Sequence, residues 1–182
     1  MQRLRQKWRS LSDKSMEIEK KFLISHLPDG LEEYEVKNIE QGYLCTNPVV
    51  RIRKSNESYI LTYKSRFGLE EQECRDVRIN QEIEAALNRQ GYEHLREKVD
   101  GYLVQKKRYV ISLEDGHTGE LDIFGGRLEG LRFVEVEFAD EQDAAAFVPP
   151  SWFGDNVSDD YRYSNSFLST CKDLSAFHIA KC

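Results

Sequence analysis

Proline is scarce in this sequence, and its cysteines lack the spacing of a metal-binding motif. The 182 residues include 4 prolines, and Cys45, Cys74, Cys171 and Cys182 form no CxxC pair. This scatter excludes a zinc knuckle and gives no sign of a compact disulfide framework, which favours a reducing compartment. No Pro/Gly/Ser-rich linker, repeat or low-complexity tract divides the chain, so its length fits one domain.

The sequence also lacks an excess of positive charge and any long hydrophobic run. The formal net charge is -6 at pH 7, which argues against a general affinity for nucleic acid or an anionic membrane. No window approaches the length of a membrane span, and the basic residues 1–16 lack the apolar core of a signal peptide. We therefore expect a cytoplasmic protein with no nucleic-acid or membrane partner.

What the sequence does have is charge, which makes up 32% of its residues and is arranged with a period of two. Alternation of polar and apolar residues is typical of strands whose two faces differ. It predicts strands at residues 17–23, 49–54, 59–64, 71–79, 102–111, 120–124 and 133–138. The prediction is therefore a mainly antiparallel β fold of the α+β class, with seven or eight strands and a few helices that cover apolar strand faces.

Helices are predicted at three places. Asn80 looks like the N-cap of a short helix that ends at Gly91. Asp140 opens a second helix, which Pro149 ends. A third amphipathic stretch follows Asn165.

The polar faces of the predicted strands repeat like charges at i and i+2. The carboxylate pairs are Glu17/Glu19, Glu120/Asp122 and Glu135/Glu137, and the cations are Lys21, Arg51, Arg53, Lys64, Lys106 and Arg108. Solvated faces usually mix their signs, because like charges side by side repel. Alternation alone is equally typical of an ordinary β-sandwich with charged outer faces. The repeated signs favour the other arrangement, in which these faces converge on one cavity.

Such a cavity would need ligands of both signs. Clustered carboxylates call for a hard divalent cation such as Mg²⁺ or Mn²⁺, which takes oxygen ligands. Clustered arginines and lysines call for an anion, and a chain of phosphates matches their donors.

Taken in order, these motifs resemble the CYTH family, also called the triphosphate tunnel metalloenzymes. The resemblance covers about residues 16 to 168 and rests on the ExExK motif at 17–21, Arg51-Ile52-Arg53, Lys64, Lys106-Lys107-Arg108, the strand at 120–124, and Glu135-Val136-Glu137. It implies a closed eight-stranded antiparallel tunnel barrel with a charged interior, formed by residues 16–182 after an N-terminal extension at 1–15.

The resemblance also implies roles for individual residues. Four carboxylates look like metal ligands that take part in catalysis, namely Glu17, Glu19, Glu135 and Glu137, and Asp122 is a further ligand or positions the attacking water. Lys21, Arg51, Arg53, Lys64, Lys106 and Arg108 look like phosphate clamps. Tyr161 and Asn165 resemble residues of the family's closing segment, although Asn165 fits a helix cap equally well. Glu71, Glu73 and Arg75 match the family's alternating acidic strand poorly and receive no role.

The implied activity is metal-dependent hydrolysis of a small-molecule triphosphate. Inorganic triphosphate is favoured, because residues 17–24 resemble the start of the compact bacterial members that act on it. Thiamine triphosphate, a nucleoside triphosphate or cyclisation of ATP by a class IV adenylyl cyclase are alternatives within the family. The alternative of another class is a module that binds polyphosphate or a phosphorylated ligand without cleaving it. A homodimer is compatible with the family.

Overall fold

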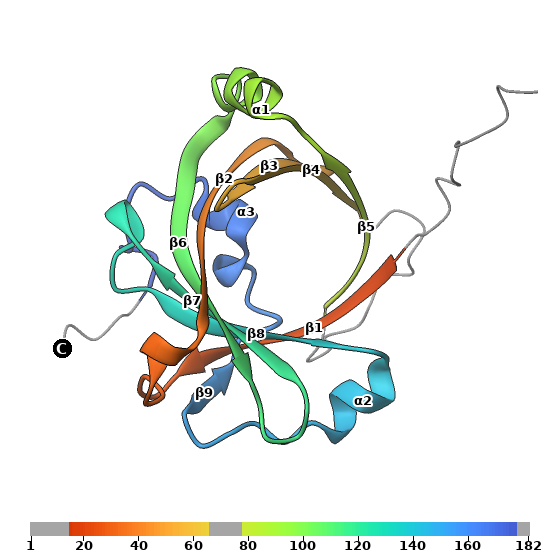
Figure 1. Cartoon of the computed structure of the whole chain (residues 1–182), viewed down its shortest axis with the longest axis vertical. Coiled ribbons are helices and arrows are strands. Elements are labelled where there is room, and N and C mark those ends of the chain that lie inside the picture. Colours follow the sequence, from red (N-terminus) through yellow and green to blue (C-terminus); the bar gives the residue numbers. More distant parts are fainter. Residues whose placement is uncertain (1–14, 66–77, 178–182) are drawn as a thin grey trace, which may run out of the picture.

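A computed structural model describes residues 15–65 and 78–177, with the side chains of residues 18–64 and 83–177 (Figure 1). Within these ranges the fold is a mainly antiparallel β-sheet with few helices, as predicted. The strands are β1 (Ser15–Ile24), β2 (Glu35–Thr46), β3 (Val49–Ser55), β4 (Ser58–Ser65), β5 (Arg78–Ala86), β6 (Asp100–Ser112), β7 (Thr118–Phe124), β8 (Arg132–Phe138) and β9 (Phe153–Asn156). The helices are α1 (Arg89–Arg96), α2 (Glu141–Ala146) and α3 (Asn165–Leu168), with 3₁₀ turns η1 (Leu31–Glu33), η2 (Gly126–Leu128) and η3 (Tyr161–Tyr163). No helix in these ranges has the length and apolar character needed to cross a membrane.

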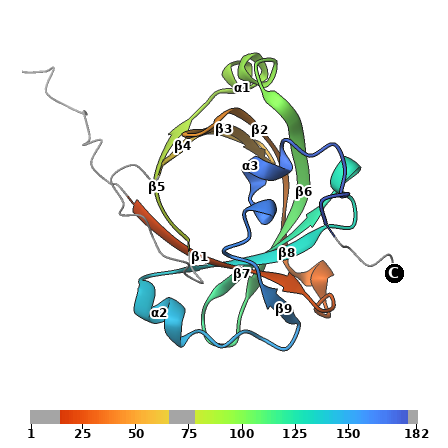
Figure 2. The same ribbon diagram turned by 180° about the vertical axis from the view of Figure 1, so that it is seen from behind.

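The strands pair in the order β5-β4-β3-β2-β6-β7-β8-β1-β9, and every pairing is antiparallel. A further ladder joins β1 to β5, with Ile18 opposite Ile79. The strands curve around a common axis, which Figures 1 and 2 show from opposite sides. Since side chains alternate along a strand, each strand presents one face towards this axis and the other face outwards.

α2 packs against β1 and β8, and β9 pairs with the C-terminal half of β1. The rings of Phe22, Phe147 and Phe153 meet there, with the Phe22 ring centroid 5.1 Å from that of Phe153. Asp140 begins α2 as predicted, because its side chain accepts a 2.8 Å hydrogen bond from the backbone N–H of Asp143.

The prediction of a helix that begins at Asn80 is wrong. Residues 78–86 form β5, and α1 begins only after Asn88, whose side chain accepts a hydrogen bond from the backbone N–H of Gly91 at 2.7 Å. Gly91 therefore lies in the first turn of a helix and does not end one. Ladders with β4 and β1 satisfy the backbone of β5 in the extended form, so pairing overrides the helix propensity of its Glu, Gln and Ala residues.

Two strands were not predicted, and one predicted strand lies mostly outside the described residues. The unpredicted strands are β2 and β9. The strand predicted at residues 71–79 is described only at Arg78 and Ile79, which begin β5. The helix after Asn165 is confirmed, but Ser164 is its N-cap and accepts from the backbone N–H of Phe167 at 3.2 Å. Asn165 is thus the first helical residue, and its interpretation as a cap is wrong.

The segment with η3 and α3 returns to the sheet and packs against β6. Leu168 is fully buried in a cluster with Val104, Phe124 and Phe133. The Ser169 carbonyl accepts a 2.7 Å hydrogen bond from the backbone N–H of Tyr102. Gly101 has a φ of 73°, and a Cβ there would lie 2.6 Å from the same carbonyl oxygen. Only glycine allows this approach. In both views α3 lies within the outline of the ring of strands (Figures 1 and 2).

Candidate functional site

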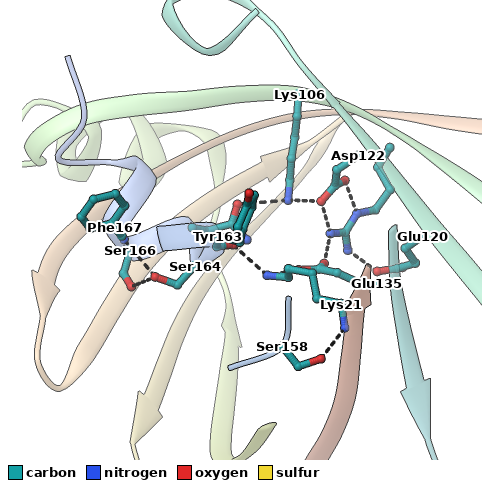
Figure 3. Close-up of polar contacts among 12 residues, drawn as sticks. Lys21, Lys106, Glu120, Asp122, Glu135, Ser158, Tyr163, Ser164, Ser166 and Phe167 are labelled. Carbon is teal, nitrogen blue, oxygen red and sulfur yellow. Dashed lines mark hydrogen bonds and ion pairs between the residues drawn. The ribbon is translucent and has the colours of Figure 1, made fainter. Parts of the chain in front are cut away.

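Five predicted site residues form a buried ionic cluster on four neighbouring strands. They are Lys21 of β1, Lys106 and Arg108 of β6, Asp122 of β7 and Glu135 of β8 (Figure 3). The three cations and Asp122 are buried, and Glu135 is half-buried. The order β6-β7-β8-β1 puts these strands side by side, so the alternating charges that the sequence shows fall on one face of the sheet.

Asp122 binds both cations of β6. Its Oδ2 lies 2.5 Å from Lys106 Nζ and 2.6 Å from Arg108 Nη2, and its Oδ1 accepts from Arg108 Nε at 2.7 Å. The pairing of a guanidinium fork with a carboxylate gives both strength and a fixed orientation. Asp122 has no exposed surface.

Glu135 connects the cations of β6 to β1. Its Oε1 lies 2.8 Å from Lys21 Nζ, and its Oε2 accepts from Arg108, which also donates to Glu120. Burial opposes ionisation of Glu135, but the charges of Lys21 and Arg108 prevail and hold the pKa of this carboxyl well below its usual range. The carboxyl is therefore ionised throughout the neutral pH range.

Lys106 is a buried cation whose charge is sensitive to pH. Burial lowers the pKa of Lys106 to about 8, against the opposing effect of the Asp122 carboxylate, and the nearby charge of Arg108 adds to the lowering. Arg108 behaves oppositely: burial disfavours its charge, but Asp122 and Glu135 raise its pKa well above the usual value. The cluster thus contains one permanent and one titratable cation on the same strand.

The C-terminal segment contacts both lysines of the cluster. Lys21 Nζ donates to the Tyr163 carbonyl at 3.0 Å, and Lys106 Nζ donates to Asn165 Oδ1 at 3.3 Å. The backbone N–H of Lys21 donates to Ser158 Oγ at 2.9 Å. Asn165 therefore lies at the cluster, whereas Tyr161 is 66% exposed and packs edge-on against Phe167.

The other predicted cations, Arg51, Arg53 and Lys64, lie on β3 and β4. Burial raises the pKa of Tyr43 on β2, and the charges of Arg51, Lys64 and Glu135 all act on this hydroxyl. Tyr43 is only 2% exposed. The Tyr43 hydroxyl is thus close to the cations of β3 and β4 and also to Glu135 of the buried ionic cluster. The two sets of charges therefore lie around the same hydroxyl.

Glu84 of β5 also belongs to this region, and sequence reasoning missed it. Its Oε1 lies 3.0 Å from Arg53 Nη2 and accepts from Thr62 Oγ1 at 3.2 Å. Glu82 and Glu84 are two apart, and the ladder places them opposite Lys64 and Thr62 of β4. The sequence does contain this pair of acidic residues two positions apart, but we interpreted the stretch as a helix and therefore did not assign the pair to a strand face. Glu71, Glu73 and Arg75 lie outside the described residues.

Four predicted metal ligands, Glu17, Glu19, Glu135 and Glu137, lie on β1 and β8, and the fifth, Asp122, lies on β7. Glu19 is the Cα partner of Glu137 in the antiparallel ladder, and Lys21 is the partner of Glu135. The backbone of Glu17 lies opposite Asn80 of β5, and its side chain is outside the described part. Within that part, no three His, Cys, Asp or Glu side chains are grouped as a metal site.

Fold and site together define an antiparallel β protein with arginine, lysine and carboxylate side chains on one face of its sheet. A protein that binds small polyanions needs such a face.

No protein-family model matches the chain. Curated relatives do match. The chain is 40% identical over 156 residues to an inorganic triphosphatase of Nitrosomonas europaea, covering 84% of this chain and 96% of that protein. It is 36% identical over 157 residues to an inorganic triphosphatase of Acetivibrio thermocellus, covering 84% and 92%. The chain belongs to the inorganic triphosphatase family.

Solved structures agree with this assignment. The crystal structure of the inorganic triphosphatase NE1496 matches with a TM-score of 0.63 and 39% identity, covering 85% of this chain and 95% of that chain. The putative adenylyl cyclase HpAC1 from Hippeastrum matches with a TM-score of 0.50 over 71% of this chain and 82% of that chain. At 14% identity this second match shows likeness of fold alone.

Proposed function

We propose that this protein is a CYTH-type triphosphate tunnel metalloenzyme that hydrolyses inorganic triphosphate to pyrophosphate and phosphate. The observation that carries the proposal is the convergence of Lys21, Lys106 and Arg108 from separate stretches of sequence into one buried ionic cluster. Burying a cation is costly unless it is paired with an anion and hydrogen-bonded. A phosphate chain is an anion of this kind. Two relatives that match most of the chain and are named inorganic triphosphatase support the same substrate.

In this proposal β1 to β8 close into an eight-stranded tunnel barrel with a charged interior. The ladder between β1 and β5 supports closure, since β5 begins the strand order and β1 follows β8. Arg53 with Glu84, and Lys21 with Glu135, would then face each other across the tunnel. Closure removes the exposed sheet edges and fixes the distances between clamps on different strands.

The carboxylates fit a hard divalent cation. Glu19 and Glu137 are opposite each other on neighbouring strands, and carboxylate oxygens are the ligands that a hard divalent cation takes. Glu19 and Glu137, with Glu17 of the same β1 face, would hold Mg²⁺ or Mn²⁺. Glu135 is engaged with Lys21 and Arg108 and would contribute to the metal only after these contacts loosen. A bound cation would supply charge neutralisation on the phosphate oxygens.

The protein's own side chains would position the substrate. Lys21, Lys106 and Arg108 would hold one part of the phosphate chain, and Arg51, Arg53 and Lys64 the rest. Water attacks the terminal phosphorus in line with the bridging oxygen that leaves, one P–O bond forms as another breaks, and a carboxylate of the set accepts the proton of the water. Such a reaction depends on positioning and electrostatics, so no nucleophilic side chain is required.

A substrate panel tests the proposal. Purified protein with Mg²⁺ is given inorganic triphosphate, thiamine triphosphate or ATP, and release of phosphate and formation of cyclic AMP are both measured. We expect the highest kcat/KM for inorganic triphosphate, no cyclic AMP, and loss of turnover on chelation of the metal. Tight binding of triphosphate without phosphate release would instead identify a binding module, and cyclic AMP as the main product would identify a cyclase.

A further inference from the structure

Asp122 differs from the other carboxylates of the site in how completely it is enclosed. Its side chain has no exposed surface, whereas the side chains of Glu135 and Glu120 are 12% and 36% exposed. Figure 3 shows Asp122 beside the amine of Lys106, to which a dashed line joins it. A metal ligand must present an oxygen to a space that a hydrated ion can enter, and Asp122 has none.

Both oxygens of Asp122 are already used. Oδ2 contacts Lys106 Nζ at 2.5 Å and Arg108 Nη2 at 2.6 Å, and Oδ1 contacts Arg108 Nε at 2.7 Å. A carboxylate has about four acceptor sites, so three charged donors leave little capacity for a cation. A metal at Asp122 would also have to replace these donors and leave Lys106 and Arg108 buried without their partner, which is costly.

The contacts of Arg108 separate two kinds of carboxylate. Asp122 binds the edge of the guanidinium formed by Nε and Nη2, while Glu120 binds Nη1 and Glu135 shares Nη2 with Asp122. A phosphate group that enters the site can take over the outer donors from the partly exposed Glu120 and Glu135. The enclosed Asp122 stays in place, so the guanidinium keeps its direction while its outer partners change.

We propose that Asp122 is a positioning residue for triphosphate, in place of the metal-ligand or water-positioning role expected from the sequence. It holds Lys106 and Arg108 charged, side by side and pointing from β6 towards the tunnel, so that the two clamps are preorganised before substrate binds. This inference rests on the proposed function, because the clamps have a role only if a polyanion binds there.

The variant Asp122→Asn tests the inference, because its metal binding and its substrate binding can be measured separately. Asparagine keeps the shape of the side chain but loses the charge and one of the acceptor oxygens. Mn²⁺ affinity is measured by titration calorimetry without substrate, and kcat and KM for inorganic triphosphate are measured at saturating Mg²⁺. Glu137→Gln serves as the variant expected to lose metal, and Asp155→Asn, an exposed residue of β9, serves as the matched control.

For Asp122→Asn we expect Mn²⁺ affinity within about twofold of the wild type and a KM that rises about tenfold or more. Glu137→Gln should lose Mn²⁺ affinity and keep its KM, and Asp155→Asn should match the wild type in both quantities. A loss of Mn²⁺ affinity in Asp122→Asn comparable to that in Glu137→Gln, or an unchanged KM, overturns the inference. A wild type that neither binds nor cleaves triphosphate overturns the proposed function itself, whereas an active wild type with the wrong Asp122→Asn pattern overturns only the positioning role.

A second comparison covers the case in which Asp122→Asn does not fold. Removing both partners of a buried ion pair is tolerated better than removing one, so Lys106→Gln is compared with Lys106→Gln/Asp122→Asn. If Asp122 acts through its cations, Lys106→Gln/Asp122→Asn keeps the Mn²⁺ affinity of Lys106→Gln. A loss of Mn²⁺ affinity on adding Asp122→Asn contradicts the inference.

Discussion

Glu19 of β1 and Glu137 of β8 lie directly opposite each other in the antiparallel ladder. Like charges in this arrangement destabilise a strand pair, and a divalent cation between them would relieve the repulsion. We therefore expect Mg²⁺ or Mn²⁺ to raise the melting temperature of the wild type. Glu137→Gln should reduce this effect of the metal. Glu129→Gln, an exposed residue beyond the sheet, is the control and should leave the effect unchanged.

The ion pair between Arg53 and Glu84 predicts a role in substrate capture. A hydrogen bond to a charged group contributes about 1.5–3 kcal/mol, which corresponds to roughly a 10- to 150-fold change in affinity. Arg53→Ala should therefore raise KM for inorganic triphosphate within that range and change kcat less. Lys54→Ala, at the next position of β3 and on its opposite face, is the matched control. Equal effects of the two substitutions on KM would show that Arg53 lies outside the site.

The pKa of Lys106 predicts an alkaline limit to activity. Burial lowers this pKa to about 8, and the charged groups around Lys106 are Asp122, Arg108 and Glu135, with the neutral Asn165 amide beside them. In the free enzyme Lys106 loses its proton above that pH, so kcat/KM for triphosphate should fall. Lys106→Arg should move the fall to higher pH, because arginine stays charged. A pH profile of kcat/KM that does not differ between the two proteins would contradict this assignment.

Unfolding does not account for such a fall in activity. Between about pH 8 and the unfolded-state pKa of lysine, about 10.4, the unfolded chain binds more protons at this position than the folded protein. Lys106 therefore makes the folded state more stable as the pH rises through that window. Thermal denaturation at each pH of the profile separates the two effects.

His117 predicts a pH effect on stability away from the site. Its Nδ1 lies 3.0 Å from Asp115 and its Nε2 lies 3.2 Å from Asp143 of α2. Burial disfavours the charged ring, but the two carboxylates prevail and raise the pKa of His117. The stabilisation is complete below the unfolded-state pKa of about 6.5 and is lost as the pH rises through the raised folded-state value.

The variant His117→Gln tests this effect. Chemical denaturation between pH 6 and 9 should give a smaller fall in the free energy of unfolding for His117→Gln than for the wild type. His94→Gln, in the exposed part of α1, is the control. A pH dependence that is unchanged in His117→Gln would show that the contacts with Asp115 and Asp143 contribute nothing to stability.

Alternation predicted the strands that carry the site because their polar faces are charged. A period of two was enough to put Lys21, Lys106 and Glu135 on the charged faces of their strands, and the repeated signs favoured bringing these faces together. The same rule failed at β2, where Gln41 and Tyr43 are buried on the face that carries charge in other strands. A neutral polar residue and an aromatic residue give no alternating signal.

Two features of the site depend on long-range pairing and could not be predicted from the sequence. Glu84 lies in a stretch of strong helix formers, and only the ladders with β4 and β1 make it a strand. The enclosure of Asp122 depends on side chains from neighbouring strands, which determine how much of a carboxylate is exposed. Sequence alone therefore grouped Asp122 with Glu135 and Glu137, although the three differ in burial.

The central claim is that the charged faces of these strands bind one triphosphate and its metal. A crystal structure with Mn²⁺ and a non-hydrolysable imidotriphosphate tests it most directly. We predict phosphate density in contact with Lys21, Arg53, Lys106 and Arg108, and a Mn²⁺ anomalous peak beside Glu19 and Glu137. Phosphate density confined to the outer surface, with no ligand among these side chains, would contradict the claim.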